Sequence, residues 1–307
     1  MAGDASTRRF FRLFPASGAP VVVMDYGSPF TEPTDDQVLT DIFIKSDLPV
    51  PAIIDAEPDV GCLLLQDLGR RMLEDELQNP DDQGQPPELL LRAAELAGRI
   101  ARDGSAVLAE SSRAHGPALD AGRFRFEMDF FLENFVVKHR KVMGGQGELR
   151  GWLYQLADSA AESPRQVLCH RDYHCRNIMI VSDGSLAMAD IQDARWGPDT
   201  YDIASLAFDA YVERPDGWVD PLLVRYLETM GINDDTLLRN RVHRVAAQRM
   251  IKALGTFGYQ VEVAGNRRYA DAIPRTLSRL DRWLAGNEET SSIHAAFGTL
   301  GLFADLP

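Results

Sequence analysis

The chain has 307 residues, 45% hydrophobic and 25% charged, so it is long enough to bury one large core or to form two lobes. Its 32 basic and 46 acidic residues give a net charge of −14, which argues against nucleic acid or an anionic membrane surface as a partner. Three cysteines without paired spacing (Cys62, Cys169 and Cys175), no secretion signal and no apolar run near the ~20 residues that span a bilayer predict a soluble cytoplasmic protein without a disulfide framework or zinc site.

The first quarter of the chain has the pattern of short strands. Residues 7–14 and 20–26 are rich in β-branched and aromatic side chains, and prolines and a glycine separate them, which predicts two antiparallel strands. Thr34 or Asp35 is expected to cap a helix that runs to about Ser46. Residues 53–68 predict two further strands around a turn at 58–61.

The remainder of the chain is predicted to be mainly helical. A polar, proline-rich loop at 79–88 precedes the helices, and a strand-rich stretch at 166–191 interrupts them. The helices are expected at about 89–109, 123–142, 148–162, 202–213, 219–230, 236–257 and 267–285. The predicted fold class is therefore α+β, with a small β-rich lobe at 1–67 and a larger helical lobe at 68–307.

The segment 167–206 carries the most informative motif. His170-Arg171-Asp172 followed by Asn177 has the H-R-D-x-x-x-x-N spacing of a kinase catalytic loop. Two candidate strands come next around a turn at 183–184, and the second ends on Asp190. A histidine and an aspartate at this spacing are common by chance, and His170 alone would be read as a core residue; the complete series is much less common.

This spacing suits phosphoryl transfer from a nucleotide. The reaction needs a positioned acceptor and neutralised phosphate charge more than covalent chemistry. Asp172 is the candidate base for the attacking hydroxyl. Asn177 and Asp190 offer the oxygen ligands that Mg²⁺ prefers, and phosphates and water would complete its shell. We therefore expect ATP and Mg²⁺ as cofactors.

The same stretch resembles the aminoglycoside phosphotransferase and choline kinase superfamily, which has the bilobal fold of protein kinases. Asp190-Ile191-Gln192 stands where protein kinases have Asp-Phe-Gly. Residues 201–204 resemble the start of the helix that follows in this superfamily. The resemblance implies that Asp202 braces the catalytic loop, so Asp202 and His170 are expected to have structural roles.

Four segments narrow the resemblance further. GDASTRRFFR at 3–12, LLLQDLG at 63–69, HRDYHCRN at 170–177 and DIQDARWGPDTYDIASL at 190–206 are together similar to bacterial kinases of peptidoglycan recycling. Those enzymes phosphorylate the anomeric hydroxyl of N-acetylmuramate and N-acetylglucosamine. The resemblance implies an amino-sugar acceptor.

The resemblance also implies a nucleotide site. The turn at 3–7, with Ser6 and Thr7, would cover the phosphates, and Gln66, Asp67 and Leu68 would form the hinge that binds adenine. An ordinary turn and an ordinary loop after an edge strand are the alternatives for these two segments. A strand normally precedes such a phosphate turn, so it is expected to be missing, very short or encoded upstream.

One element of the kinase pattern is missing. Met24 and Asp25 stand where a strand should offer the lysine that pairs with nucleotide phosphates. Three arginines near the first strand are candidate replacements: Arg8, Arg9 and Arg12. Strand alternation sends Arg9 to the face opposite the other two, and we expect Arg9 to reach inward toward phosphate and Asp41. Solvent-facing arginines are the alternative.

The acceptor is expected to meet residues around the catalytic loop. The candidates are Arg176, Gln192, Asp193 and Arg195, which offer a planar cationic fork and hydrogen-bonding groups to a sugar or its carboxylate. Three alternatives stay open: an aminoglycoside or choline-type kinase, a kinase of another metabolite, and a nucleotide-binding pseudokinase. The missing lysine favours the last alternative, and the intact series of Asp172, Asn177 and Asp190 opposes it.

Overall fold

The computed structural model describes residues 8–77, 85–233, 235 and 237–304. An antiparallel sheet in the order β1-β2-β4-β3 occupies the first part of the chain. Its strands are β1 (Arg9–Leu13), β2 (Val21–Asp25), β3 (Ile53–Glu57) and β4 (Cys62–Gln66). Helix α1 (Asp35–Lys45) starts at a capping box, in which the Thr34 hydroxyl accepts from the Gln37 N–H and the Gln37 side chain accepts from the Thr34 N–H. The strands and the helix expected here are confirmed.

The rest of the chain is mainly helical, as expected. Its α-helices are α2 (Leu73–Leu77), α3 (Glu88–Arg99), α4 (Ser105–Ala109), α5 (Ala121–Phe131), α6 (Gln146–Ala161), α7 (Tyr201–Ala207), α8 (Val219–Met230), α9 (Leu238–Glu262), α10 (Ala272–Ala285) and α11 (Ser291–Thr299). Its π-helical segments are η1 (Ile100–Gly104) and η2 (Leu132–His139), and its short 3₁₀ turns are η3 (Asp216–Trp218), η4 (Arg267–Tyr269) and η5 (Glu288–Thr290).

The sequence reading missed or misplaced four of these elements. Helices α2 and α11 and strand β8 (Arg195–Pro198) were not expected. Helix α7 ends at Ala207 instead of continuing to about 213. The buried Asp209 carboxylate explains this end, because it accepts hydrogen bonds from the backbone N–H groups of Cys175 and Tyr211 and so draws the chain away from the helix.

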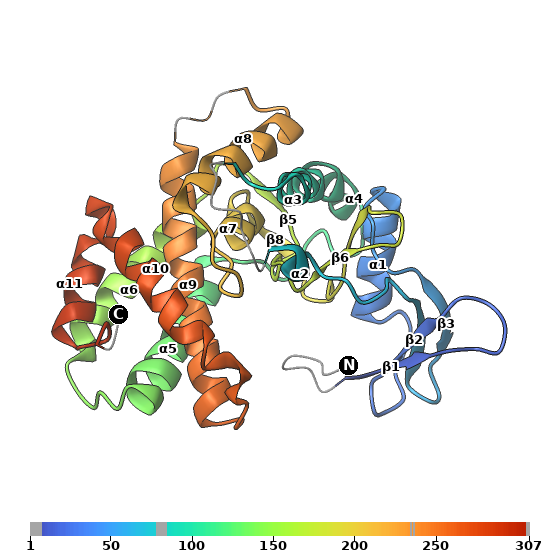
Figure 1. Ribbon diagram of the computed structural model, residues 1–307, viewed down its shortest axis with the longest axis horizontal. Coiled ribbons are helices and arrows are strands. Elements are labelled where there is room, and N and C mark those ends of the chain that lie inside the picture. The colour runs from blue at the N-terminus through green and yellow to red at the C-terminus, as the bar shows by residue number, and fades with distance from the viewer. Residues whose placement is uncertain (1–7, 78–84, 234, 236, 305–307) are drawn as a thin grey trace.

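Two small strand pairs lie between the sheet and the large helices (Figure 1). Strand β5 (Gln166–Cys169) pairs with β8, and β6 (Ile178–Ile180) pairs with β7 (Leu186–Met188), both antiparallel. In Figure 1 the sheet and α1 lie at one end of the molecule and α9, α10 and α11 at the other. The loops that connect β5 to β8 therefore occupy the middle of the molecule.

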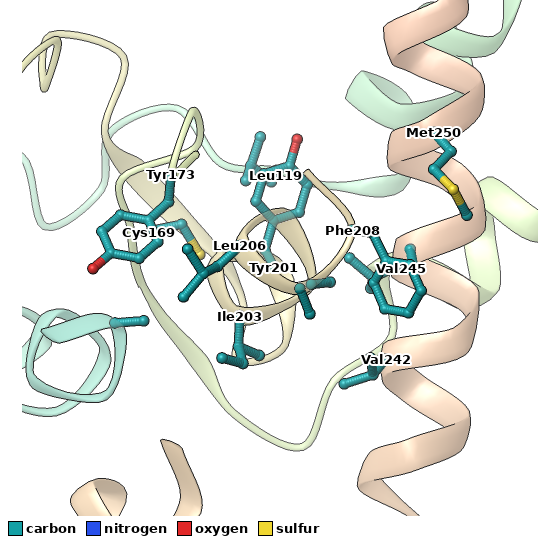
Figure 2. Close-up of a cluster of buried hydrophobic side chains, with 14 of the residues drawn as sticks. Leu119, Cys169, Tyr173, Tyr201, Ile203, Leu206, Phe208, Val242, Val245 and Met250 are labelled. Carbon is teal, nitrogen blue, oxygen red and sulfur yellow. The ribbon is translucent and has the colours of Figure 1, made fainter. Parts of the chain in front are cut away.

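The hydrophobic core continues from one end to the other. Leu39, Ile42 and Phe43 on α1 belong to the same buried cluster as the large helices. Figure 2 shows part of it, where Tyr201 begins α7, Phe208 follows the last residue of α7 and Met250 comes from α9. Burial of such large side chains typically stabilises a fold by about 1.5–3 kcal/mol each. In the part of the chain that the structure describes, no helix combines the length and apolar character needed to cross a bilayer.

Candidate active site

Helix α7 fixes the loop between β5 and β6 through hydrogen bonds. Asp202, in the first turn of α7, accepts hydrogen bonds from the backbone N–H groups of His170 (2.6 Å) and Arg171 (3.0 Å). Burial raises the pKa of Asp202, and these N–H groups and His170 act in the opposite direction. The His170 ring nitrogen Nε2 lies 2.9 Å from the Ala189 carbonyl oxygen, which joins the loop to the end of β7. Arg171 is fixed at a left-handed φ of 79°, a conformation that surrounding contacts must maintain.

Asp172 lies within a group of basic side chains. Its Oδ1 is 3.3 Å from Nζ of Lys252, and 26% of its side chain is exposed. Burial raises the pKa of this carboxyl, but the positive charges of Lys252, Arg171 and Arg249 outweigh burial and hold the pKa well below its usual range. Asp172 is therefore ionised at neutral pH.

Asn177 and Asp190 stand at the two ends of the β6–β7 hairpin. Asn177 Nδ2 donates to the Asp172 carbonyl oxygen at 2.9 Å, and the Asn177 carbonyl accepts from the Ala189 N–H at 2.9 Å. Asp190 has a left-handed φ of 63° and an exposed side chain that accepts a hydrogen bond from Gln192. A non-glycine residue in this region is uncommon and is often found at functional sites.

The oxygen donors of this hairpin fit a hard divalent cation. The hydrogen bond from Asn177 uses its amide nitrogen, so the amide oxygen is the atom left for a cation, and Asp190 adds a carboxylate. Magnesium keeps several waters and phosphate oxygens and needs few protein ligands. No cluster of three or more His, Cys, Asp and Glu residues suited to a metal occurs among the described residues. The donor set therefore fits magnesium held together with phosphates and does not form a closed metal cage.

These groups open into one cavity of about 570 Å³, a size typical of small-molecule sites. Its charged lining is balanced: it consists of Arg8, Arg171, Arg249 and Lys252 with Asp172, Asp190, Asp193 and Asp209. Its other polar and aromatic lining includes His174, Asn177, Gln192, Ser205, Thr256, Tyr211, Phe257 and Tyr269. The three residues of the kinase motif and the acceptor candidates Gln192 and Asp193 are thus brought together.

Helix α9 supplies basic groups that the sequence reading missed. Lys252 approaches Asp172, and Arg249 donates to the Arg171 carbonyl oxygen at 2.9 Å while its guanidinium lies 4.4 Å from the centre of the Tyr201 ring. A helix was expected here, but no site residue was assigned to it. The available signal was the spacing of Arg249, Lys252 and Thr256, which places polar groups on one face of a helix that is otherwise largely buried.

Two acceptor candidates are engaged elsewhere. Arg176 forms a two-point ion pair with Glu74, with both nitrogen–oxygen distances at 3.0 Å, and its guanidinium lies 3.8 Å from the centre of the Tyr211 ring. Arg195 pairs with Asp193 at 2.8 Å. Neither arginine is among the described residues that line the cavity. The geometry therefore gives no support for contact of either arginine with an acceptor.

The arginines near β1 face the opposite way from our expectation. Arg9 points outward, with 66% of its side chain exposed and Nη2 at 2.6 Å from Asp25, while Asp41 pairs with Lys45. Arg8 instead lines the cavity. The alternation was expected correctly, but the choice of face was not, because the pairing of Arg9 with Asp25 on β2 keeps Arg9 on the solvent side of the sheet.

The expected adenine hinge lies where β4 ends. Asp67 is fixed by Arg12, whose Nε is 2.7 Å from Asp67 Oδ2, and by the Gly69 N–H at 2.9 Å from Oδ1. Gln66 is the last residue of β4, and Leu68 follows the fixed aspartate. The side chain of Asp67 thus stabilises the turn, so any base contact here falls to backbone groups. The expected phosphate turn, with Ser6 and Thr7, lies outside the described residues.

A family model and two relatives agree on one family. The model of the phosphotransferase enzyme family (APH) matches residues 1–237. The chain is 30% identical to the N-acetylmuramate/N-acetylglucosamine kinase of Pseudomonas aeruginosa, over 97% of this chain and 87% of that protein. It is 29% identical to the enzyme of the same name from Neisseria meningitidis serogroup B, over 96% and 87%.

Solved structures show the same fold at low identity. A choline/ethanolamine kinase family protein from Mesorhizobium loti has a TM-score of 0.57 at 14% identity, covering 95% of this chain and 93% of that one. A spectinomycin phosphotransferase solved with ADP and spectinomycin has a TM-score of 0.54 at 12% identity, covering 97% and 92%. The expected protein-kinase-like α+β fold is confirmed.

Proposed function

We propose, because the chain belongs to the phosphotransferase enzyme family and is a small-molecule kinase, that it transfers the γ-phosphoryl group of ATP to the anomeric hydroxyl of an N-acetylated amino sugar. The observation that carries this proposal is the convergence of Asp172, Asn177 and Asp190 on one cavity whose lining also includes aromatic side chains. The two curated relatives supply the acceptor class, N-acetylmuramate and N-acetylglucosamine. We further propose that this reaction serves peptidoglycan recycling in the cytoplasm.

Asp172 acts on the acceptor hydroxyl in this proposal. Its low pKa keeps it ionised and able to accept a hydrogen bond from the hydroxyl, which orients the oxygen toward phosphorus. A weak base is sufficient because phosphoryl transfer has a loose transition state and demands little proton removal. The hydrogen bond from Asn177 to the Asp172 backbone fixes the loop in this position. Asn177 and Asp190 would hold magnesium, which neutralises phosphate charge when it is bound.

Residues 1–67 form the nucleotide-covering lobe of this proposal, and residues 68–307 carry the acceptor site. The backbone of Gln66, Asp67 and Leu68 would bind adenine, since the Asp67 side chain is already occupied. Ser6 and Thr7 would cover the phosphates. The relation to a spectinomycin phosphotransferase solved with ADP is consistent with an adenine nucleotide as donor.

The aromatic part of the cavity lining fits a sugar ring. Tyr211, Phe257 and Tyr269 form neighbouring aromatic pairs, with Phe257 and Tyr269 stacked at 5.5 Å between ring centres. Such rings offer apolar surface to one face of a sugar, and a few polar groups set its orientation. Thr256 and Gln192 supply polar groups in the same lining.

A polycationic acceptor such as an aminoglycoside fits this lining less well. It would need acidic side chains without partners. Asp209 lines the cavity, but it accepts from the Cys175 N–H at 2.8 Å and from the Tyr211 N–H at 2.8 Å, and it pairs with buried Arg214. Asp193 is shared between Arg171 and Arg195. Apart from Asp172 and Asp190, which this proposal assigns to the acceptor hydroxyl and to magnesium, each carboxylate among the described lining residues is already engaged by arginine.

The test is product identification from ATP, Mg²⁺ and N-acetylmuramate. We expect a sugar phosphate whose ³¹P–¹H coupling places the phosphate on the anomeric carbon. A parallel panel of N-acetylglucosamine, choline and kanamycin separates the alternatives. Preferential phosphorylation of choline or kanamycin, or phosphate on another sugar hydroxyl, would refute the proposed reaction.

A further inference from the structure

The cavity contains a basic residue at the place where the kinase lysine is missing. Arg8 directly precedes β1 and lines the same cavity as Asp172, Asn177 and Asp190. Its side chain is 15% exposed. On β2, where the lysine is expected, Met24 is buried and Asp25 is paired with Arg9.

Arg8 is held by an acidic residue on α1. Its Nη1 lies 2.7 and 2.8 Å from the two carboxylate oxygens of Asp36, in the first turn of the helix. The Tyr26 hydroxyl donates to the same carboxylate and lies 3.4 Å from the Thr34 hydroxyl. The Arg8 guanidinium also lies 5.9 Å from the centre of the Tyr26 ring. The side chain is therefore restrained from two sides.

This arrangement repeats the logic of the kinase lysine–glutamate pair with different residues. In that pair a strand lysine touches the phosphates and a glutamate on the neighbouring helix restrains it. Here the cation comes from the residue just before the adjacent strand. Arg9, the first residue of β1, pairs with Asp25 at the end of β2, so Arg8 lies beside the end of the strand that usually offers the lysine. The long arginine side chain and its planar donor fork suit a phosphate.

We propose that Arg8, restrained by Asp36 and Tyr26, is the phosphate-binding cation of the nucleotide site and takes the place of the lysine–glutamate pair. This inference rests on the proposed nucleotide donor and adds the residue that the kinase motif lacks. It also explains why Arg9, although adjacent, has no such role: Arg9 lies on the solvent face with Asp25. Arg9, the next residue and the first of β1, is thus a matched control.

The experiment measures nucleotide binding without any acceptor. Wild type, Arg8→Met, Asp36→Asn and the control Arg9→Met are titrated calorimetrically with Mg²⁺ and a non-hydrolysable ATP analogue, and with adenosine by ligand-observed NMR. Loss of charge-assisted hydrogen bonds should weaken analogue binding about 10- to 100-fold in Arg8→Met. Adenosine, which has no phosphate, should bind as to wild type. Asp36→Asn should weaken only the analogue, by a smaller factor, and Arg9→Met should change neither.

Equal weakening of the analogue and adenosine in Arg8→Met would overturn the assignment, because it would indicate a structural role. Unchanged analogue binding in Arg8→Met would overturn it as well. If Arg8→Met does not fold, Asp36→Asn decides: no selective loss of the analogue refutes the proposal. A failure of the amino-sugar reaction leaves these binding results interpretable, so the two proposals are tested separately.

Discussion

Lys252→Met should raise the pKa of Asp172. Lys252 Nζ lies 3.3 Å from Asp172 Oδ1, with 19% and 26% of the two side chains exposed. Coulomb's law at this distance gives about 1 kcal/mol in water and about 5 kcal/mol at an effective dielectric constant of about 20. Divided by about 1.4 kcal/mol per pH unit, the midpoint of Asp172 should move upward by about 1 to 4 pH units.

The sign of the effect on stability follows from the same pKa. Asp172 has a folded pKa below its ordinary value, so its ionised form stabilises the fold above about pH 4, and this stabilisation is lost as the pH falls further. Without Lys252 the folded pKa lies closer to the unfolded value. Lys252→Met should therefore lose stability at neutral pH and show a weaker dependence on pH in acid.

Carboxyl ¹³C NMR of the unliganded protein measures this directly, with the Asp172 signal assigned from its loss in Asp172→Asn. Lys252→Arg keeps the positive charge and should leave the midpoint low. Lys45→Met removes an exposed lysine paired with Asp41 and should leave Asp172 unchanged. An Asp172 midpoint that stays low in Lys252→Met would refute the reasoning and assign the depression to Arg171 and Arg249.

Three further outcomes are expected. Asp172→Asn should lower kcat about 10²- to 10⁴-fold with little change in nucleotide affinity, whereas Asp190→Ala should weaken Mg²⁺-dependent nucleotide binding. Calorimetry measures both affinities, and equal loss of nucleotide binding in the two variants would contradict their separate roles. Gly258→Ala should destabilise the fold by about 1–3 kcal/mol, because its new Cβ would lie 2.6 Å from the backbone of η2. Gly151→Ala on α6 meets nothing within 4 Å and should stabilise the fold by about 0.5–1 kcal/mol. Urea unfolding compares the two variants. Asp202→Ala should lose about 1–3 kcal/mol of stability, as two buried N–H groups lose their acceptor, and should lower kcat as well; normal turnover in a destabilised variant would refute the link between this residue and the loop.

The fold was largely predictable because its signals are local. The capping box at Thr34 and the alternating strands on either side of the turn at 58–61 specify their elements within a few residues. The early end of α7 was not predictable, since it depends on Asp209 binding the backbone of Cys175, 34 residues earlier in the chain. Long-range hydrogen bonds of this kind leave no periodic signal in the sequence.

The same distinction between local and long-range signals applies to the residues of the site. Asp172, Asn177 and Asp190 were found because one loop and one hairpin place them at fixed spacing. Lys252 lies 80 residues from Asp172, and no motif joins them. The contrast between Arg8 and Arg9 required the face of the sheet to be known, since alternation gives opposite faces but does not say which one meets the cavity.

Helix α9 carries both residues that pack in the core and basic residues of the site. Gly255 and Gly258 lie against the backbone of α5 and η2, while Lys252, less than two turns away, reaches Asp172. A helix rises about 1.5 Å per residue, so both glycines lie within about 10 Å of Lys252 along the helix axis. A side chain added at either glycine would shift the helix and Lys252 with it. In related chains, substitutions that change these glycine contacts would therefore alter catalysis even where every cavity-lining residue is identical.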